Sequence, residues 1–523
     1  MMIPPTTFVC KTIQCIKSLH STMKGLYKTS QTALSSFIRV LLIRVDPFWL
    51  QLCYFVTLFM IGFLVLAILE PRNPSYRPGN YDLLFTSVSA VTVSSMATVE
   101  MEVFSNTQLF CLAILMLLGG EVFTSILVLQ FKKFKLLDKK ERQVNSTINL
   151  SSLNTDLEIG SNSWKHNMEM KCNAMKFLGV IALSYFVTVQ VCGFLLVSLY
   201  VGVVPSAKEV LNNKNLNVQV FSIVTTISTF VNCGFLPTNE SMVVFKKNLG
   251  LLLILIPLVL LGNTLYPVFL RLILLLLGKI SKREELEYLL KNYAELGYDH
   301  LLSGAHCWYL ALTSTVFIFI QFVLLISNGW KSKAMDGLSP LEKLVGSLFQ
   351  AVNTRHTGES VFDLSLVSPA IIVLIVTMMY LPAYTYFLPR EDKGNFSHTG
   401  NNRNKAPKTS SIGFLLLTPL PFWVLVIMLI CITENENMQK DPLNFSVLNI
   451  IFEVISAYGN VGFSLGYSCK RQLQPNENCR DAWYGFVGRW NNISKLVLIL
   501  VMIFGRLKKF HKRGGKAWKL SKR

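Results

Sequence analysis

Charged side chains are scarce in this chain. Asp, Glu, Lys and Arg make up only 15% of its 523 residues, whereas 51% of the residues are hydrophobic. Ordinary soluble domains carry roughly 25% charged residues. The composition therefore excludes a soluble protein of this length and predicts a membrane protein whose surroundings are the lipid bilayer.

Acidic residues are scarcer than basic ones. The chain has 30 Asp and Glu against 50 Lys and Arg, which gives a formal net charge of +20. Such an excess can indicate binding to nucleic acid, but the basic residues lie in polar stretches beside apolar runs, and no aromatic-basic recognition motif accompanies them. We expect no nucleic-acid partner, because positive charge on the cytoplasmic side of a membrane accounts for the pattern.

Sequence motifs for catalysis are missing. The seven histidines form no HxxHH or HExxH cluster, and the chain has no Walker A phosphate-binding loop. These absences argue against membrane di-iron and zinc enzymes and against ATP-driven transport. We expect a protein that is not an enzyme and that needs no cofactor.

Paired cysteines are almost missing as well. None of the eleven cysteines belongs to a CxxC pair or shows the spacing of metal ligands. Most lie in segments predicted to be cytoplasmic or within the membrane, where thiols stay reduced. Cys469 and Cys479 differ, since both fall in a loop predicted to face the oxidising side. These two are candidates for a disulfide, with free thiols as the alternative.

Long apolar runs are what the chain has in quantity. The first charge-free run, at residues 49–69, is long enough to cross the hydrocarbon core at about 1.5 Å rise per residue. The last span is the least apolar, because its continuous apolar run covers only residues 496–505, and the predicted helix includes Lys495 and Arg506. The other spans are predicted at residues 107–131, 177–204, 250–277, 308–327, 368–388 and 412–432, with the last at 492–511.

Four shorter segments lie between pairs of spans and are rich in Ser, Thr and β-branched residues. Non-helical backbone at membrane depth is tolerated only where it lines water or is buried in protein, and rings of carbonyl oxygens that replace an ion's hydration shell are its known use. The segments are residues 86–106, 218–235, 341–359 and 444–463. The last three segments end near a lone glycine, and the first has a serine at the equivalent position. These four residues are the predicted selectivity filter: Ser95, Gly234, Gly358 and Gly462.

The pattern of span, loop and span predicts an all-α membrane protein with eight transmembrane helices in four units around one central pore. Both termini are expected in the cytoplasm, because they are basic and because eight spans return the chain to its starting side. No removable signal peptide is evident. The predicted parts are a cytoplasmic N-terminus (1–46), pore unit A (47–131), a cytoplasmic linker (132–176), pore unit B (177–278), a cytoplasmic connector (279–306), pore unit C (307–389), a second cytoplasmic linker (390–411), pore unit D (412–511) and a basic cytoplasmic tail (512–523).

Polar residues near the loop ends are expected to support the filter. Asn232 and Asn460 precede their glycines by two positions and, with Ser94, are predicted to brace the loops through hydrogen bonds. An alternative places Ser94 at the axis and Ser95 behind it. Acidic residues just beyond the loop ends are expected to gather cations in an outer vestibule, with solvated surface carboxylates as the alternative: Glu100, Glu102, Glu240 and Glu359.

Two charges within predicted spans are functional hypotheses, because ionisable residues are costly in a membrane. Arg506 is predicted to face the pore as an inner barrier that slows passing cations. Glu121 follows Gly119 and Gly120 in the second span, and we expect it to be a buried structural partner rather than an ion ligand.

The loop sequences resemble the four filter segments of plant HKT cation transporters, in the wider Trk/Ktr/HKT superfamily. The segments are VSSM with EMEVFSNTQL, STFVNCGFLPTNESM, VGSLFQAVNTRHTGE and EVISAYGNVGF, and the resemblance covers about residues 49–518. It implies one central pore per chain, a homodimer and a plasma-membrane location. The family's filter positions fall on the four predicted filter residues.

A Ser-Gly-Gly-Gly filter resembles that of class I members, which implies Na⁺ selectivity, whereas all-glycine filters belong to members that also carry K⁺. Serine has a Cβ and a hydroxyl that narrow one corner of the ring, so the passage of K⁺ should be hindered more than that of Na⁺. We therefore expect passive Na⁺ transport. A K⁺/Na⁺ symporter of the same fold is the alternative, and a membrane enzyme or receptor is a third interpretation.

Overall fold

The computed structural model describes residues 47–74, 76–150, 158–355, 357–381, 419–473 and 479–511. The predicted N-terminus 1–46, the linker 390–411 and the tail 512–523 lie outside these residues. The chain divides into two compact parts, Met1–Tyr54 and Phe55–Arg523. The first part contains only the beginning of one helix among its described residues, and all the other described residues belong to the second part.

The described residues are helical, with no strand among them. The helices up to residue 280 are α2 (Pro47–Ile68), α3 (Asn80–Thr92), α4 (Asn106–Gly119), α5 (Glu121–Leu150), α6 (Glu158–Val203), α7 (Pro205–Asn213), α8 (Val218–Val231), α9 (Leu249–Gly262) and α10 (Tyr266–Ile280). They are followed by α11 (Glu284–Lys291), α12 (Tyr293–Leu296), α13 (Gly304–Gly329), α14 (Pro340–Asn353), α15 (Pro369–Tyr380), α17 (Pro419–Thr433), α18 (Asn435–Lys440), α19 (Val447–Gly459) and α20 (Asn492–His511).

Each predicted filter segment contains one short helix; we call α3, α8, α14 and α19 the re-entrant helices. Side-chain caps fix where three of them begin. Asn217 accepts from the backbone N–H of Gln219 before α8, Ser446 caps α19, and Ser339 forms a capping box with Glu342 before α14. The prediction for the first segment begins too late, because α3 already starts in the polar connector at Asn80.

Two predicted spans are bent rather than straight. The second consists of α4 and α5, which meet at 50°, and the fourth of α9 and α10, which meet at 81°. Both first halves end in glycine where the helix presses on a re-entrant helix: a Cβ on Gly119 would lie 1.9 Å from the Val91 carbonyl oxygen, and one on Gly262 would lie 1.6 Å from that of Phe230. Each bend therefore lies where the span comes closest to a re-entrant helix.

By length and hydropathy, three helices of the described residues can cross a membrane: Phe48–Ile68, His166–Val203 and Gly304–Gly329. The number rises to five if each bent pair is counted as one span. The least apolar predicted span, 492–511, is a helix, α20. Its Lys495 is buried and donates to Asp82 Oδ1 of α3 at 2.8 Å, so the charge is paired where the helix begins.

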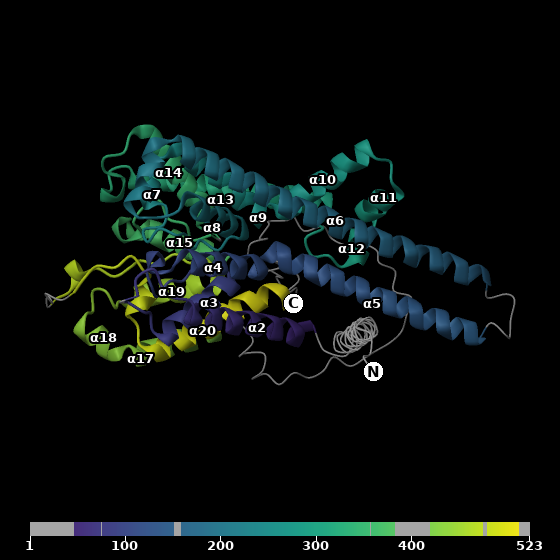
Figure 1. Ribbon diagram of the computed structural model, residues 1–523, viewed down its shortest axis with the longest axis horizontal. Helices are drawn as coiled ribbons and strands as arrows, with labels where there is room; N and C mark the ends of the chain where they lie inside the picture. The colour runs from purple at the N-terminus through teal and green to yellow at the C-terminus, as the bar shows by residue number, and fades with distance from the viewer. Residues whose placement is uncertain are drawn as a thin grey trace, which may run out of the picture. The chain divides into compact units, whose positions relative to one another are not determined.

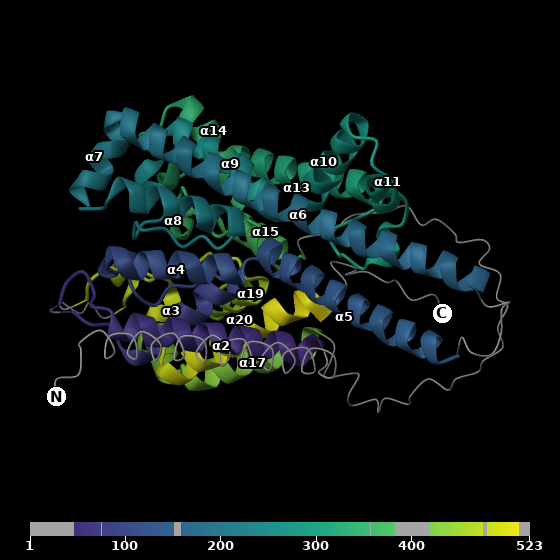
Figure 2. The same ribbon diagram turned by 45° about the vertical axis from the view of Figure 1, so that its right-hand side comes forward.

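The helices close a ring in chain order. The helix after each re-entrant helix packs against the next re-entrant helix: α4 against α8, α9 against α14, α15 against α19 and α20 against α3. The last pair joins the end of the chain to its beginning, and Figures 1 and 2 show the yellow α20 beside the purple α3. α5 and α6 run side by side away from the ring (Figure 1). Four loop ends are thereby directed at one place.

Candidate functional site

Three re-entrant helices end in a residue with left-handed backbone. Val93, Asn232 and Asn460 have φ of 58°, 58° and 51°, and each lies two positions before a predicted filter residue. The left-handed residue stops the helix and turns the chain into an extended segment. The remaining re-entrant helix, α14, ends differently, because its C-cap residue, Thr354, has right-handed backbone.

The four predicted filter residues all have positive φ. The values are 53° at Ser95, 95° at Gly234, 68° at Gly358 and 98° at Gly462. Glycine adopts such angles without steric cost, whereas a residue with a Cβ loses roughly 1–2 kcal/mol. Ser95 is therefore held in this conformation by its surroundings rather than by its own preference.

The four loop ends meet, and three of them leave no room for a side chain. A Cβ on Gly234 would lie 1.8 Å from the Thr357 carbonyl oxygen, and one on Gly358 would lie 2.1 Å from that of Val461. A Cβ on Gly462 would lie 2.2 Å from the Ser95 Cβ. The Ser95 hydroxyl oxygen is 2.9 Å from the Cβ position of both Gly234 and Gly462. At the predicted filter, unit A therefore contacts unit B, unit B contacts unit C, unit C contacts unit D, and unit D contacts unit A.

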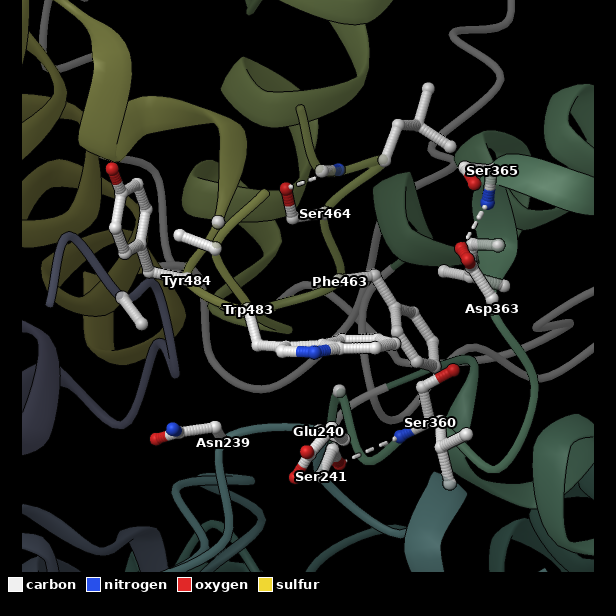
Figure 3. Close-up of a pocket in the computed structure, with 18 of the residues that line it drawn as sticks. Asn239, Glu240, Ser241, Ser360, Asp363, Ser365, Phe463, Ser464, Trp483 and Tyr484 are labelled. Carbon is white, nitrogen blue, oxygen red and sulfur yellow. Dashed lines mark hydrogen bonds between the residues drawn. The ribbon is translucent and has the colours of Figure 1, made fainter. Parts of the chain in front are cut away.

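A cavity of about 550 Å³ lies over this meeting point, and all four predicted filter residues line it. Its walls also include Glu240, Asp363 and Trp483. Figure 3 shows the Trp483 indole lying between the unit D loop and Glu240 and Ser241 of unit B.

Side chains of the re-entrant helices hold the loop ends. Ser228 Oγ accepts from the Gly234 N–H at 2.9 Å, and Ser456 Oγ accepts from the Gly462 N–H at 3.1 Å. The sequence interpretation missed both serines. The signal was present, since a serine stands six positions before the filter residue in units A, B and D, at Ser89, Ser228 and Ser456.

The predicted braces join neighbouring units. Asn460 Nδ2 donates to Ser94 Oγ at 2.8 Å and to the Met502 carbonyl at 3.1 Å. Ser94 is fully buried, whereas Ser95 lines the cavity. With its amide oriented so that both atoms are paired, Asn232 donates to the Phe230 carbonyl and accepts from Thr357 Oγ1 at 3.3 Å. One asparagine therefore links unit D to unit A, and the other links unit B to unit C.

Electrostatics at the meeting point favour a cation. A helix C-terminus carries about half a negative charge, since its last carbonyl groups are unpaired. All four re-entrant helices end within a few residues of the ring. Among the described residues, no three His, Cys, Asp or Glu side chains are grouped to hold a resident metal ion.

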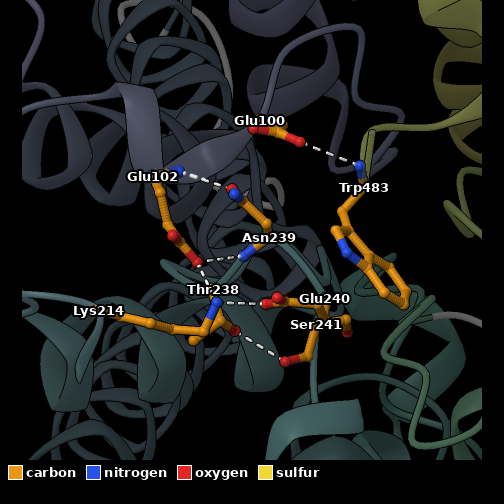
Figure 4. Close-up of polar contacts among 8 residues, drawn as sticks. All are labelled: Glu100, Glu102, Lys214, Thr238, Asn239, Glu240, Ser241 and Trp483. Atoms are coloured by element: carbon orange, nitrogen blue, oxygen red, sulfur yellow. Dashed lines mark hydrogen bonds and ion pairs between the residues drawn. The ribbon is translucent and has the colours of Figure 1, made fainter. Parts of the chain in front are cut away.

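The predicted vestibule carboxylates have different surroundings. Glu100 Oε1 accepts from the backbone N–H of Trp483 at 3.1 Å. Glu102 and Glu240 both bind Lys214, as Figure 4 shows, with oxygen–nitrogen distances of 2.6 Å. Of the four, Glu240 lines the cavity.

Glu359 does not lie in a vestibule, contrary to the prediction. It is fully buried, and its Oε1 accepts from Thr229 Oγ1 of α8 at 2.6 Å. The chain turns after Gly358, so that the carboxylate faces the helix of the neighbouring unit. A second buried carboxylate, Glu453 in α19, was missed by the sequence interpretation; its Oε1 accepts from Ser464 Oγ and from the Leu465 N–H.

Arg506 is buried in the protein. The barrier prediction requires its side chain to project into a water-filled pore, and it does not. The residue is 2% exposed. Its guanidinium donates to the Gly119 carbonyl and lies 4.0 Å from Glu121 Oε2. The break between α4 and α5 frees that carbonyl from the helix, which explains why the arginine binds there. Glu121 thus has the buried partner that was expected of it.

Cys469 and Cys479 form a disulfide with a Cα–Cα distance of 5.8 Å. They belong to the loop between α19 and α20, which also supplies Trp483 to the cavity wall. The backbone N–H of Cys469 donates to Asp481 Oδ1 at 2.6 Å.

Comparison with known proteins decides the family. The family model described as TrkH, cation transport protein, matches residues 67–385 and 416–511. The chain is 48% identical over 461 residues to the sodium transporter HKT1 of Arabidopsis thaliana, which covers 87% of this chain and 91% of that protein. The chain belongs to the HKT transporters of the TrkH family. It is therefore an ion transporter, not an enzyme.

Other HKT relatives are nearly as similar. The cation transporter HKT1;3 of Oryza sativa is 44% identical over 491 residues, covering 91% of this chain and 92% of that protein. The probable cation transporter HKT2;3 of the same species is 40% identical over 481 residues, covering 90% and 94%. Among solved structures, the potassium transporter TrkH of Vibrio parahaemolyticus is similar, with a TM-score of 0.48 and 12% sequence identity. The match covers 89% of this HKT chain and 83% of the TrkH chain.

Proposed function

We propose that this HKT transporter moves Na⁺ passively through the ring formed by Ser95, Gly234, Gly358 and Gly462, with the Ser-Gly-Gly-Gly pattern of class I. The observation that carries the proposal is the position of the Ser95 side chain. Its hydroxyl oxygen is 2.9 Å from the Cβ positions of two neighbouring glycines, so it fills room at one corner that a fourth glycine would leave open. Because Na⁺ is smaller than K⁺, this restriction raises the barrier to passage less for Na⁺ than for K⁺.

The same geometry supports a proposed path for the ion. Cations enter the cavity, lose water at the ring and are stabilised there by backbone carbonyl groups and by four helix C-termini. We place the cavity on the outer side, so that Glu100, Glu102 and Glu240 form its charged surroundings. The division into pore units A to D, with both termini in the cytoplasm of a plasma-membrane protein, belongs to this proposal. So does a homodimer with one pore in each chain.

The second candidate is a K⁺/Na⁺ symporter of the same fold. Its K⁺ component is supported by relatives that are named for potassium, such as the potassium transporter TRK1 of Candida albicans, 27% identical over 361 residues, which covers 64% of this chain and 32% of that protein. In a symporter the two ions move together, so removal of K⁺ should stop Na⁺ current.

Currents from oocytes that express the full chain separate the two candidates. We expect the reversal potential to follow external Na⁺ and to ignore external K⁺. A Na⁺ current that requires K⁺ would favour the symporter, and a reversal potential that follows both ions equally would contradict Na⁺ selectivity.

A further inference from the structure

Lys214 lies between two carboxylates that come from different pore units. Its Nζ is 2.6 Å from Glu102 Oε1, which follows the unit A loop, and 2.6 Å from Glu240 Oε2, which follows the unit B loop. All three side chains are mostly buried, with 18% of Lys214, 23% of Glu102 and 19% of Glu240 exposed. Figure 4 shows the lysine reaching between the two acids.

Backbone groups fix the same arrangement. The Glu102 N–H donates to Asn239 Oδ1 at 2.9 Å, and the Asn239 N–H donates to Glu102 Oε1 at 3.1 Å. Burial lowers the pKa of Lys214, but its hydrogen bonds and its attraction to Glu102 and Glu240 outweigh burial, so the pKa is raised and the ammonium stays charged. Because Asn239 and Glu240 line the cavity, this ammonium is fixed beside its wall.

We propose that Lys214 is a built-in counter-ion that weakens the negative potential at the mouth of the cavity and thereby limits how fast cations enter at low salt. Two carboxylates and one ammonium leave a single net negative charge. The inference rests on the proposed function in one respect, namely that ions enter through this cavity.

The size of the effect follows from Coulomb's law. One unit charge about 10 Å from the ion path in water changes the local cation concentration by a factor of about two without screening. Screening reduces this factor to roughly 1.7 at about 10 mM salt and to roughly 1.2 at about 150 mM salt. The ratio of currents at the two salt concentrations therefore isolates the electrostatic contribution.

The test measures that ratio in oocytes, with mannitol replacing the omitted salt and with whichever alkali cation carries current. Lys214→Gln should raise the current at low salt by about 1.5- to 2-fold relative to the parent and change it little at high salt. Glu102→Gln should lower it by a similar factor, because it removes a negative charge. The double variant Lys214→Gln/Glu102→Gln restores the net charge and should return the ratio to that of the parent.

Two further variants complete the design. Lys214→Arg keeps the charge and should match the parent. Lys208→Gln makes the same charge change on the exposed face of α7, where the described residues give the lysine no ion pair, and should leave the ratio unchanged.

The proposal is overturned if Lys214→Gln leaves the ratio unchanged. It is also overturned if the double variant is impaired more than either single variant, since that would make the lysine a structural clamp. A parent that conducts K⁺ as well as Na⁺ would contradict the proposed Na⁺ selectivity but would leave this measurement valid.

Discussion

At the scale of single residues, Ser95 differs from its three counterparts by one hydroxymethyl group. Ser95→Gly removes that group where units B and D approach unit A, and it also relieves the positive φ of 53°. We expect the permeability of K⁺ relative to Na⁺ to rise roughly fivefold, which corresponds to about 1 kcal/mol in relative barrier height. Reversal potentials with external Na⁺ and K⁺ exchanged measure this change.

The matched control is the neighbouring serine. Ser94→Gly makes the same chemical change, but Ser94 is fully buried and its hydroxyl accepts from Asn460 rather than facing the cavity. Its effect on selectivity should be smaller. If Ser95→Gly stays as Na⁺-selective as the parent while Ser94→Gly does not, the wrong serine has been placed at the ion path.

Arg506 gives a prediction about assembly of the protein. In Arg506→Gln the Glu121 carboxylate, 11% exposed, loses its cation, and breaking such a buried pair costs about 3–5 kcal/mol. We expect less protein at the cell surface and a lower thermal midpoint, measured by surface labelling and by melting of the purified transporter. The double change Arg506→Gln/Glu121→Gln should recover part of the loss. Normal surface levels with increased inward current would instead restore the pore-barrier prediction.

At the scale of elements, two re-entrant helices, α8 and α19, hold the predicted filter residues through a serine hydroxyl. Ser456→Ala removes the acceptor of the half-buried Gly462 N–H, and the loss of one such hydrogen bond costs about 0.5–1.5 kcal/mol. We expect reduced Na⁺ current and poorer discrimination against K⁺. Ser89→Ala is the control, because Ser89 occupies the same position in α3 but its hydroxyl has no hydrogen-bond partner among the described residues. Equal effects of both changes would show that the hydroxyl bond does not matter.

The existence of the re-entrant helices could be predicted from the sequence, whereas their ends could be predicted only in part. The segment 218–235 places the start of α8 at the residue where the structure has it, because an asparagine cap stands before an apolar run. The segment 86–106 missed the first turns of α3, because Asn80 and Asp82 belong to a polar stretch that hydropathy assigns to a connector. Local composition marks an element but does not fix its ends.

At the scale of the whole molecule, each chain forms its own ring, and this predicts the current from cells that express parent and inactive chains together. Gly358→Arg should abolish current, because even a Cβ there would lie 2.1 Å from a carbonyl oxygen. Gly202→Arg is the control, since nothing lies within 4 Å of a Cβ at that position. If each chain of a dimer has its own pore, equal co-expression of Gly358→Arg with the parent leaves about half the current, whereas a pore shared by two chains leaves about a quarter.

The sequence by itself determined the membrane class, the four repeated segments and the residues at their ends. Each of these depends on composition or spacing within a short stretch, and a long apolar run or a lone glycine after a Ser- and Thr-rich segment can be recognised without its neighbours in space. The family resemblance rested on the same short segments, and it is shown by identity over most of the chain.

Only the tertiary structure decided how the charged side chains are used. Arg506 binds Gly119, Lys214 binds Glu102 and Glu359 binds Thr229, and these partners are 387, 112 and 130 positions apart. No local pattern encodes such pairs, because they form when the ring brings different units together. The bends after Gly119 and Gly262 were not predicted either, since they lie at backbone contacts with the re-entrant helix of the same unit, which hydropathy along the span does not reveal.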